Sequence, residues 1–89
     1  QQKTFKNLSY RRSLKFDFYL TEYNACIEYD GEQHYRPIDY WGGEKGFKEL
    51  QIKDRIKDLY CEINNIPLLR IRYDNQDIEG TIKSFLNII

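Results

Sequence analysis

The chain has 89 residues, of which 40% are hydrophobic and 31% charged, and its basic and acidic side chains balance to a formal net charge of zero. This size and composition allow one compact domain, and the charged fraction, close to the globular average, excludes an intrinsically disordered chain. Zero net charge argues against a stand-alone nucleic-acid binder, and no apolar run approaches the ~18 residues of a membrane-spanning helix.

The charges are unevenly distributed along the chain. Residues 1 to 16 carry basic side chains and no acidic one, whereas residues 17 to 44 carry many acidic side chains and Arg36 as their single base. A solvated charge run is the ordinary explanation of such asymmetry. The alternative is a cation bound by the acidic residues, which would reverse the local sign and let a phosphate group approach. Charge alone leaves both explanations open.

The cysteines and the N-terminus bear on the setting of the chain. Cys26 and Cys61 lie in apolar stretches and fit no metal-ligand spacing, so we expect buried free thiols in a reducing compartment, the cytoplasm. The first residues include no initiator methionine and show no signal-peptide pattern. We therefore expect residues 1–89 to be a single domain that is a fragment of a longer protein.

Two strands are predicted in the first third of the chain. Over residues 14 to 20, large apolar side chains occupy every second position, which is typical of one strand with a buried face. Residues 25 to 30 form a second strand, and residues 3 to 8 could add an edge strand. The apolar face is expected to supply the core through Leu14, Phe16, Phe18, Leu20, Ala25 and Ile27. The other face of the second strand carries Cys26, Glu28 and Asp30.

The remaining sequence predicts helix, strand and helix. Residues 32 to 44 are polar and aromatic, so they form a long loop that could contain one irregular turn. A helix is predicted over 45–63, a strand over 66–73 and an amphipathic helix over 78–89. The first helix has an apolar stripe that we expect to face the core, formed by Ile52, Ile56, Leu59 and Ile63.

The order of these elements predicts the topology. A strand, a helix and a further strand favour a right-handed crossover with parallel pairing, next to the antiparallel hairpin of the first two strands. The expected fold is therefore α/β, with a small mixed sheet and flanking helices.

The register of the hairpin brings acidic residues together. A tight turn or a four-residue loop over residues 21 to 24 places Asp17 directly opposite Glu28, with Asp30 two positions along on the same face. Like charges directly opposite each other destabilise a strand pair, so this arrangement needs a reason. One reason is a solvated face. The other is a divalent cation, Mg²⁺ or Mn²⁺, since such hard ions prefer carboxylate oxygens.

Two further side chains could act at this patch. His34, the only histidine, follows Asp30 by four residues, and it is either a structural residue or a general base or acid beside a metal-bound water. Asp54, on the predicted helix, points away from the apolar stripe and lies in line with Phe47, Leu50 and Cys61. It is either a surface acid or part of a second, partly covered face.

These residues carry a resemblance to a known family. The chain resembles the Vsr-like branch of the PD-(D/E)xK nuclease superfamily, and within it the EDxHD homing endonucleases encoded by phage mobile introns. The matching segments, in the family's order, are Phe16-Asp17-Phe18, residues 27 to 34, Asp54 with Lys57, and Leu68-Leu69-Arg70-Ile71. The resemblance implies a restriction-endonuclease-like core.

The resemblance also implies roles for single residues. Asp17 would be the central metal ligand, and Glu28 would take the acid position of the (D/E)xK element. Asp30 is a third candidate ligand because the strand register places it on the same face, and not because of the resemblance. His34 would act on the attacking water or the leaving group, with Asp54 as a supporting acid. The lysine of the element is absent because Asp30 stands in its place, so its role could pass to His34 or Gln33. No acid precedes Asp17, where the family has a glutamate on an upstream helix.

The implied function is metal-dependent hydrolysis of phosphodiester bonds in double-stranded DNA, with Mg²⁺ or Mn²⁺ as cofactor. Sequence specificity would reside in a separate DNA-binding region, and a phage-encoded protein would act in the host cytoplasm. The residues expected to contact DNA are Arg11, Arg12, Tyr35, Tyr40 and Trp41. The alternative for the aromatic residues is packing over the sheet, and the alternative for the two arginines is a solvated turn. Alternatives are mismatch-repair or restriction activity on the same core, and a nuclease-fold module that binds without catalysis. The sequence leaves the oligomeric state open.

Overall fold

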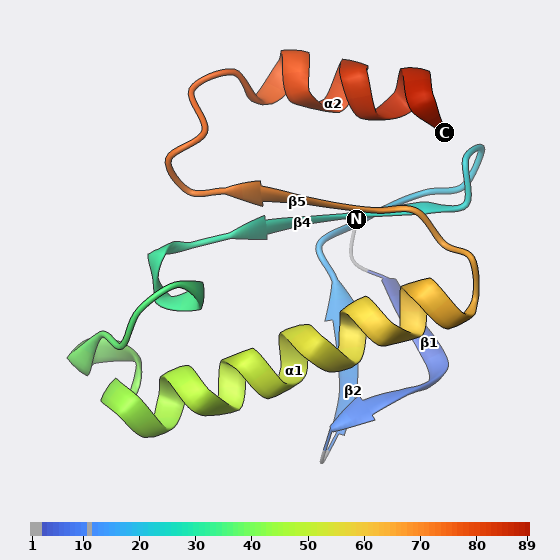
Figure 1. The fold of residues 1–89 in the computed structure, drawn as a ribbon. Helices are drawn as coiled ribbons and strands as arrows, with labels where there is room; N and C mark the ends of the chain where they lie inside the picture. Colours follow the sequence, from blue (N-terminus) through green and yellow to red (C-terminus); the bar gives the residue numbers. More distant parts are fainter. Residues whose placement is uncertain (1–2, 11) are drawn as a thin grey trace.

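A computed structural model describes residues 3–10 and 12–89 and contains two helices and five strands (Figure 1). The strands are β1 (Lys3–Tyr10), β2 (Arg12–Phe16), β3 (Phe18–Leu20), β4 (Ala25–Asp30) and β5 (Leu68–Arg72). The helices are α1 (Gly43–Ile63) and α2 (Ile78–Ile88), and the short 3₁₀ turns η1 (Glu32–His34) and η2 (Asp39–Trp41) connect β4 to α1. No helix in these ranges is long and apolar enough to cross a membrane.

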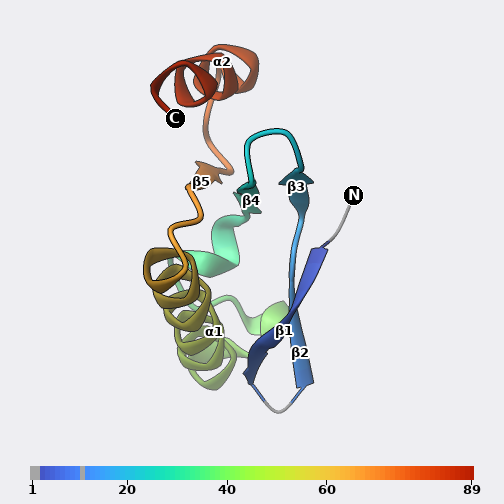
Figure 2. The ribbon, with the colours of Figure 1, turned by 90° about the vertical axis from the view of Figure 1, so that its right-hand side faces the viewer.

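The strands form two small sheets. In the three-stranded sheet β3 pairs antiparallel with β4, and β5 pairs parallel with β4 on its other side. Helix α1 lies on one face of this sheet and α2 on the other, as Figure 1 shows. Strands β1 and β2 form a separate antiparallel ribbon that runs beside α1 (Figure 2). The predicted mixed sheet with flanking helices is thus confirmed. Residues 3 to 8 do form part of a strand, β1, but the prediction that they add an edge to the mixed sheet is wrong, because β1 pairs with β2 in the separate ribbon.

The hairpin has the predicted register. Phe18 pairs with Ile27 and Leu20 pairs with Ala25, so the pairing extrapolates to Asp17 opposite Glu28. The four-residue loop begins with a turn in which Tyr23 N–H donates to the Leu20 carbonyl over 3.1 Å.

The expected single strand over residues 14–20 is wrong, because the chain breaks at Asp17 into β2 and β3. Phe16 is fully buried on the α1 side of the sheet, whereas Phe18 lies on the opposite side and is 49% exposed. The carboxylate of Asp17 accepts a hydrogen bond of 2.9 Å from the backbone N–H of Tyr29. A side chain therefore continues the strand pairing where the backbone bends.

Two apolar cores lie on the two sides of the sheet. The core on the α1 side contains Leu8, Leu14, Phe16, Cys26, Cys61 and Ile66. The core on the α2 side contains Ala25, Ile27, Ile71 and Phe85. Alternation along β4 sends successive residues to opposite cores. The two cysteines are buried free thiols, as the sequence predicts.

Helix α1 does not bury the face that its apolar stripe predicts. Ile52, Leu59 and Ile63 are 43%, 37% and 76% exposed, and the face turned toward β4 carries Lys57 and the buried Cys61. The physical reason lies in β4, whose α1 side presents carboxylates as well as apolar atoms. Buried charges require partners, so the helix face that supplies them is the one that packs.

Candidate functional site

The α1-facing side of β4 buries two carboxylates. Glu28 and Asp30 are 4% and 2% exposed, and they stand two positions apart on the same face of the strand. Burying an unpaired carboxylate is very unfavourable, so each of them needs a cation close by. Each has one, supplied by a different element.

Glu28 is paired with Lys57 of α1. Lys57 Nζ donates to Glu28 Oε1 over 2.6 Å, and both side chains are largely shielded from water. Burial raises the pKa of Glu28 to about 7, although Lys57 opposes the shift, and the neighbouring Asp17 carboxyl raises the pKa further. Asp17 and Glu28 thus form the predicted acidic pair, with an ammonium group beside it.

Asp30 is paired with Arg70 of β5. One guanidinium nitrogen of Arg70 contacts both carboxylate oxygens of Asp30, at 3.0 and 3.1 Å. The same side chain donates to Asp58 over 2.9 Å and to the backbone carbonyl of Asp54 over 3.2 Å. Burial raises the pKa of Asp30, while Arg70 and His34 act to lower it. Arg70 therefore links β4 to α1 through three aspartates.

His34 lies between the end of β4 and α1. Its Nδ1 is 2.8 Å from Asp54 Oδ2 and 3.7 Å from Asp30 Oδ1. The hydrogen bond with Asp54 raises the pKa of His34 above its ordinary value of 6.5, against the opposing effect of burial. Asp54 faces the site and is not an ordinary surface acid, in keeping with the second covered face that its apolar neighbours indicate.

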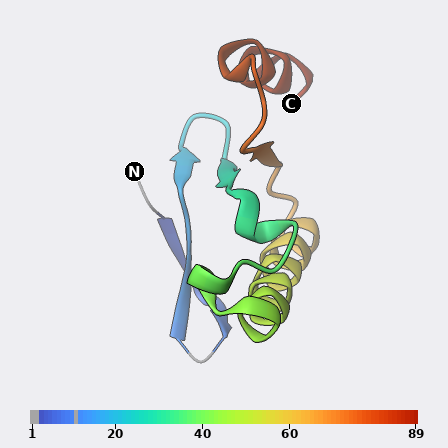
Figure 3. The same ribbon diagram turned by 90° about the vertical axis from the view of Figure 1, so that its left-hand side faces the viewer.

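The site thus consists of two adjoining groups. Asp17, Glu28 and Lys57 form the first, and Asp30, His34, Asp54 and Arg70 form the second. The connecting segment with η1 and η2 runs from the end of β4 along the same side as α1 (Figure 3). The sequence alone predicts that four acidic residues and one histidine lie in one region, namely Asp17, Glu28, Asp30, His34 and Asp54. It does not separate them into two groups.

The donor set for a metal is smaller than the sequence indicates. Within residues 3–10 and 12–89, no group of three or more histidine, cysteine or acidic side chains is placed to hold a metal ion. Both oxygens of Asp30 accept hydrogen bonds from Arg70, which leaves Asp17 and Glu28 as the carboxylates that could coordinate a cation. Two carboxylates fit Mg²⁺, which commonly takes one or two of them together with water and phosphate oxygens.

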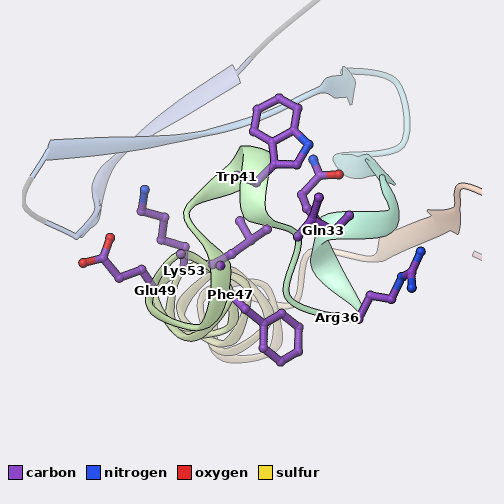
Figure 4. A pocket seen from close by; sticks show the side chains of 10 residues that line it. Gln33, Arg36, Trp41, Phe47, Glu49 and Lys53 are labelled. Carbon is purple, nitrogen blue, oxygen red and sulfur yellow. The ribbon is translucent and has the colours of Figure 1, made fainter.

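Gln33 and Trp41 line a pocket of about 330 Å³ between the two 3₁₀ turns and the first half of α1. Figure 4 shows both side chains extending from the turns away from α1, with Phe47 on the opposite side. A Cβ atom at Gly31 would meet the amide of Gln33 and displace this flexible side chain. Within the described residues, Gln33 forms no hydrogen bond or ion pair with either group of the site, and its catalytic role stays a prediction.

The other residues expected to contact DNA are Tyr35, Tyr40, Arg12 and Arg11. Tyr35 packs against Tyr73. The guanidinium carbon of Arg72 lies over the Tyr35 ring, 4.2 Å from the centroid of that ring. Tyr40 is 85% exposed, and Arg12 is exposed at the start of β2. Arg11 lies outside the described residues.

The sequence motifs contain two site residues, Lys57 and Arg70, to which sequence analysis assigns no role. The signal for Lys57 is its spacing from Asp54, because residues three apart share one face of a helix. The signal for Arg70 is its central position in an apolar strand, where a charged residue needs a partner. Which carboxylate each cation meets depends on the packing of α1 and on the pairing of Glu28 with Arg70 across parallel strands.

Comparisons with known proteins give relatives but no family. No family model and no solved structure matches the chain. Over 77 residues, 84% of the chain, it is 31% identical to a protein of Frog virus 3 (isolate Goorha) named uncharacterized protein 094L. Over 67 residues it is 33% identical to uncharacterized protein 307L of Invertebrate iridescent virus 6. The matches cover 50% and 34% of these two viral proteins, so the chain spans about half the length of the first and a third of the second.

Proposed function

We propose that the chain is the catalytic domain of a divalent-metal-dependent endodeoxyribonuclease with a restriction-endonuclease-like core. The observation that carries the proposal is the acidic pair of the partly exposed Asp17 and the buried Glu28, with Lys57 beside it, next to the hydrogen-bonded His34 and Asp54. The topology supports it, since a hairpin followed by a helix and a parallel strand is the arrangement that the resemblance to Vsr-like nucleases implies.

In this proposal Asp17 and Glu28 hold Mg²⁺ or Mn²⁺. When bound, the cation supplies Lewis-acid chemistry: it polarises a phosphate oxygen and lowers the pKa of a bound water. Asp17 is anchored by the N–H of Tyr29, and Glu28 by Lys57. Both carboxylates are therefore held in place by bonds that the fold provides.

Lys57 supplies the positive charge that the sequence motif lacks. Asp30 occupies the position of the usual lysine, but the ammonium group of Lys57 reaches Glu28 from α1 at 2.6 Å. In the proposed reaction this ammonium stabilises the negative charge that develops on the phosphate. The ion pair favours Lys57 for this role over His34 or Gln33.

His34 is the proposed proton-transfer residue. Its Nδ1 is engaged with Asp54, so Nε2 is the nitrogen that exchanges a proton with substrate. Because Asp54 raises the pKa of His34, the protonated form persists to higher pH. A protonated imidazole acts as a general acid, so we assign His34 to protonation of the leaving oxygen.

DNA would approach the side formed by η1, η2 and the β1–β2 ribbon. Trp41 is 56% exposed, and it can stack on a base or wedge between two of them. Arg12 can contact a phosphate. The separate DNA-binding region expected from the sequence would lie in the longer protein.

Plasmid nicking by the full-length protein tests the proposal. We expect cleavage with Mg²⁺ and none with a chelator, and a loss of at least about 100-fold in rate for Asp17→Asn and for Lys57→Ala, because each removes a charge from the reacting centre. Asp74→Asn is the matched control, since Asp74 is an exposed acid that pairs with Arg72. Cleavage by Asp17→Asn at the parent rate would refute the assignment.

A non-catalytic nuclease-fold module is the second candidate. The observation in its favour is that Lys57 and Arg70 already neutralise the two buried carboxylates of β4. Such a module would need no cation for its fold or for binding.

A further inference from the structure

The outer side of α1 carries a row of aliphatic side chains that the fold leaves largely uncovered. Ile52, Leu59 and Ile63 are 43%, 37% and 76% exposed, and Ile56 between them is partly buried. Figure 2 shows α1 at the margin of the molecule, so that one side of it faces away from the sheets. Exposed aliphatic rows of this kind mark interaction surfaces.

The spacing of the row indicates the kind of partner. Its four residues follow the alternating steps of four and three that define the a and d positions of a heptad repeat, two heptads long. We call this row of Ile52, Ile56, Leu59 and Ile63 the seam. A narrow seam of this kind fits the same seam on another helix, because each side chain at a or d inserts between four residues of the partner helix. A flat sheet or an irregular loop would not follow this period.

We propose that the partner is a second copy of this chain, bound through α1 in an antiparallel arrangement about a two-fold axis. In this arrangement Ile52 packs against Ile63 of the second copy, and Ile56 packs against Leu59 of the second copy. All four residues of both seams are then paired. The interface is isologous, the commonest type in homodimers.

The charges beside the seam favour this partner and this direction. Arg55 and Glu62 are exposed on the same flank of the seam, and neither forms an ion pair within the part of the chain that the structure describes. The antiparallel arrangement brings Arg55 next to Glu62 of the second copy, and the two-fold axis repeats this pair. A parallel arrangement would place Arg55 near Tyr60 and Glu62 near Pro67, with no opposite charges in contact. The surface is thus complementary to itself in one orientation.

Sedimentation equilibrium on the full-length protein tests the proposal. Since the seam is short, we expect a weak dimer with a dissociation constant of about 10 to 100 µM. Ile63→Glu should raise this constant at least about tenfold, because it places two acids in the seam. The control is Ile88→Glu on α2, where the isoleucine is 82% exposed and lies outside the seam, and it should leave the constant unchanged. A monomer at every concentration up to ~1 mM, well above this range, would overturn the proposal.

Charge reversal tests the direction of the helices. Glu62→Arg should weaken the dimer several-fold, and the double change Arg55→Glu with Glu62→Arg should restore it, because the cross-pairs are rebuilt with exchanged signs. Weakening without rescue would contradict the antiparallel arrangement. If the full-length protein is monomeric and a cysteine introduced by Ile63→Cys resists a thiol reagent, another segment of the same chain covers the seam, and the second copy is the wrong occupant.

Discussion

At the scale of single residues, the molecule is organised around two buried carboxylates and the cations that reach them. Lys57 comes from α1 and Arg70 from β5, so both pairs connect β4 to a neighbouring element. Removing one partner of a buried ion pair lowers the stability of the fold by more than the intact pair contributes to it, because the remaining charge has neither water nor a counter-ion. The two cations therefore have a structural role in addition to the proposed catalytic one.

Replacement of Arg70 by methionine should test this structural role. Asp30 would keep its burial and lose both hydrogen bonds from the guanidinium, so we expect the free energy of unfolding to fall by about 3 kcal/mol or more. Urea denaturation monitored by circular dichroism gives this value. Arg72→Met on the same strand is the matched control, because Arg72 forms an exposed pair with Asp74 and its loss should change stability little.

The pH dependence of this variant has a definite sign. Without Arg70, burial holds the pKa of Asp30 in the folded protein above its value in the unfolded chain. The folded protein therefore binds the Asp30 proton more tightly than the unfolded chain does, and lowering the pH favours folding. The stability deficit of Arg70→Met should therefore shrink as the pH is lowered. A deficit that grows toward low pH would show that the pairing of Asp30 is not its cause.

The hydrogen bond between His34 and Asp54 should set the pKa of His34. Asp54→Asn removes the carboxylate that raises this pKa, so we expect the pKa to fall and the alkaline limb of the cleavage profile to move to lower pH. NMR titration of the His34 ring protons measures the pKa directly, with Asp74→Asn as the control. A His34 pKa below 6.5 in the parent protein, or no change in Asp54→Asn, would contradict the assigned partner.

At the scale of elements, the sequence predicts what alternation and turn length determine. The register of β3 with β4 follows from the length of the connecting loop, and the parallel pairing of β5 follows from the intervening helix. The acidic pair of Asp17 and Glu28 can therefore be predicted from the sequence. Its geometry needs only local rules of strand pairing.

The break at Asp17 and the orientation of α1 depend on tertiary packing. Continuous alternation around Phe16 and Phe18 suggests one strand, but the first ring joins the core against β1 and α1 while the second lies on the other side. Similarly, the most regular apolar stripe of α1 is not the face that packs. A helical pattern shows which residues share a face and not which of two faces meets the sheet.

At the scale of the whole molecule, the three-stranded sheet separates an apolar layer under α2 from a mixed layer under α1. The α2 side contains only hydrophobic core residues, and the α1 side combines an apolar core with the charged groups of β4. This division lets one small sheet provide stability on one side and chemistry on the other. The proposed dimer seam lies on the outer side of α1, away from the site on the inner side.

The central claim is that Asp17 and Glu28 hold a divalent cation, and calorimetric titration of the full-length protein with Mn²⁺ tests it most directly. We expect saturable binding in the micromolar to millimolar range, since few carboxylates contribute to such sites. Binding should be lost in Asp17→Asn and retained in the control Asp74→Asn. Absence of Mn²⁺ binding by the parent protein at millimolar concentration, or equal binding by Asp17→Asn, would contradict the account, and the first of these results would favour the non-catalytic module.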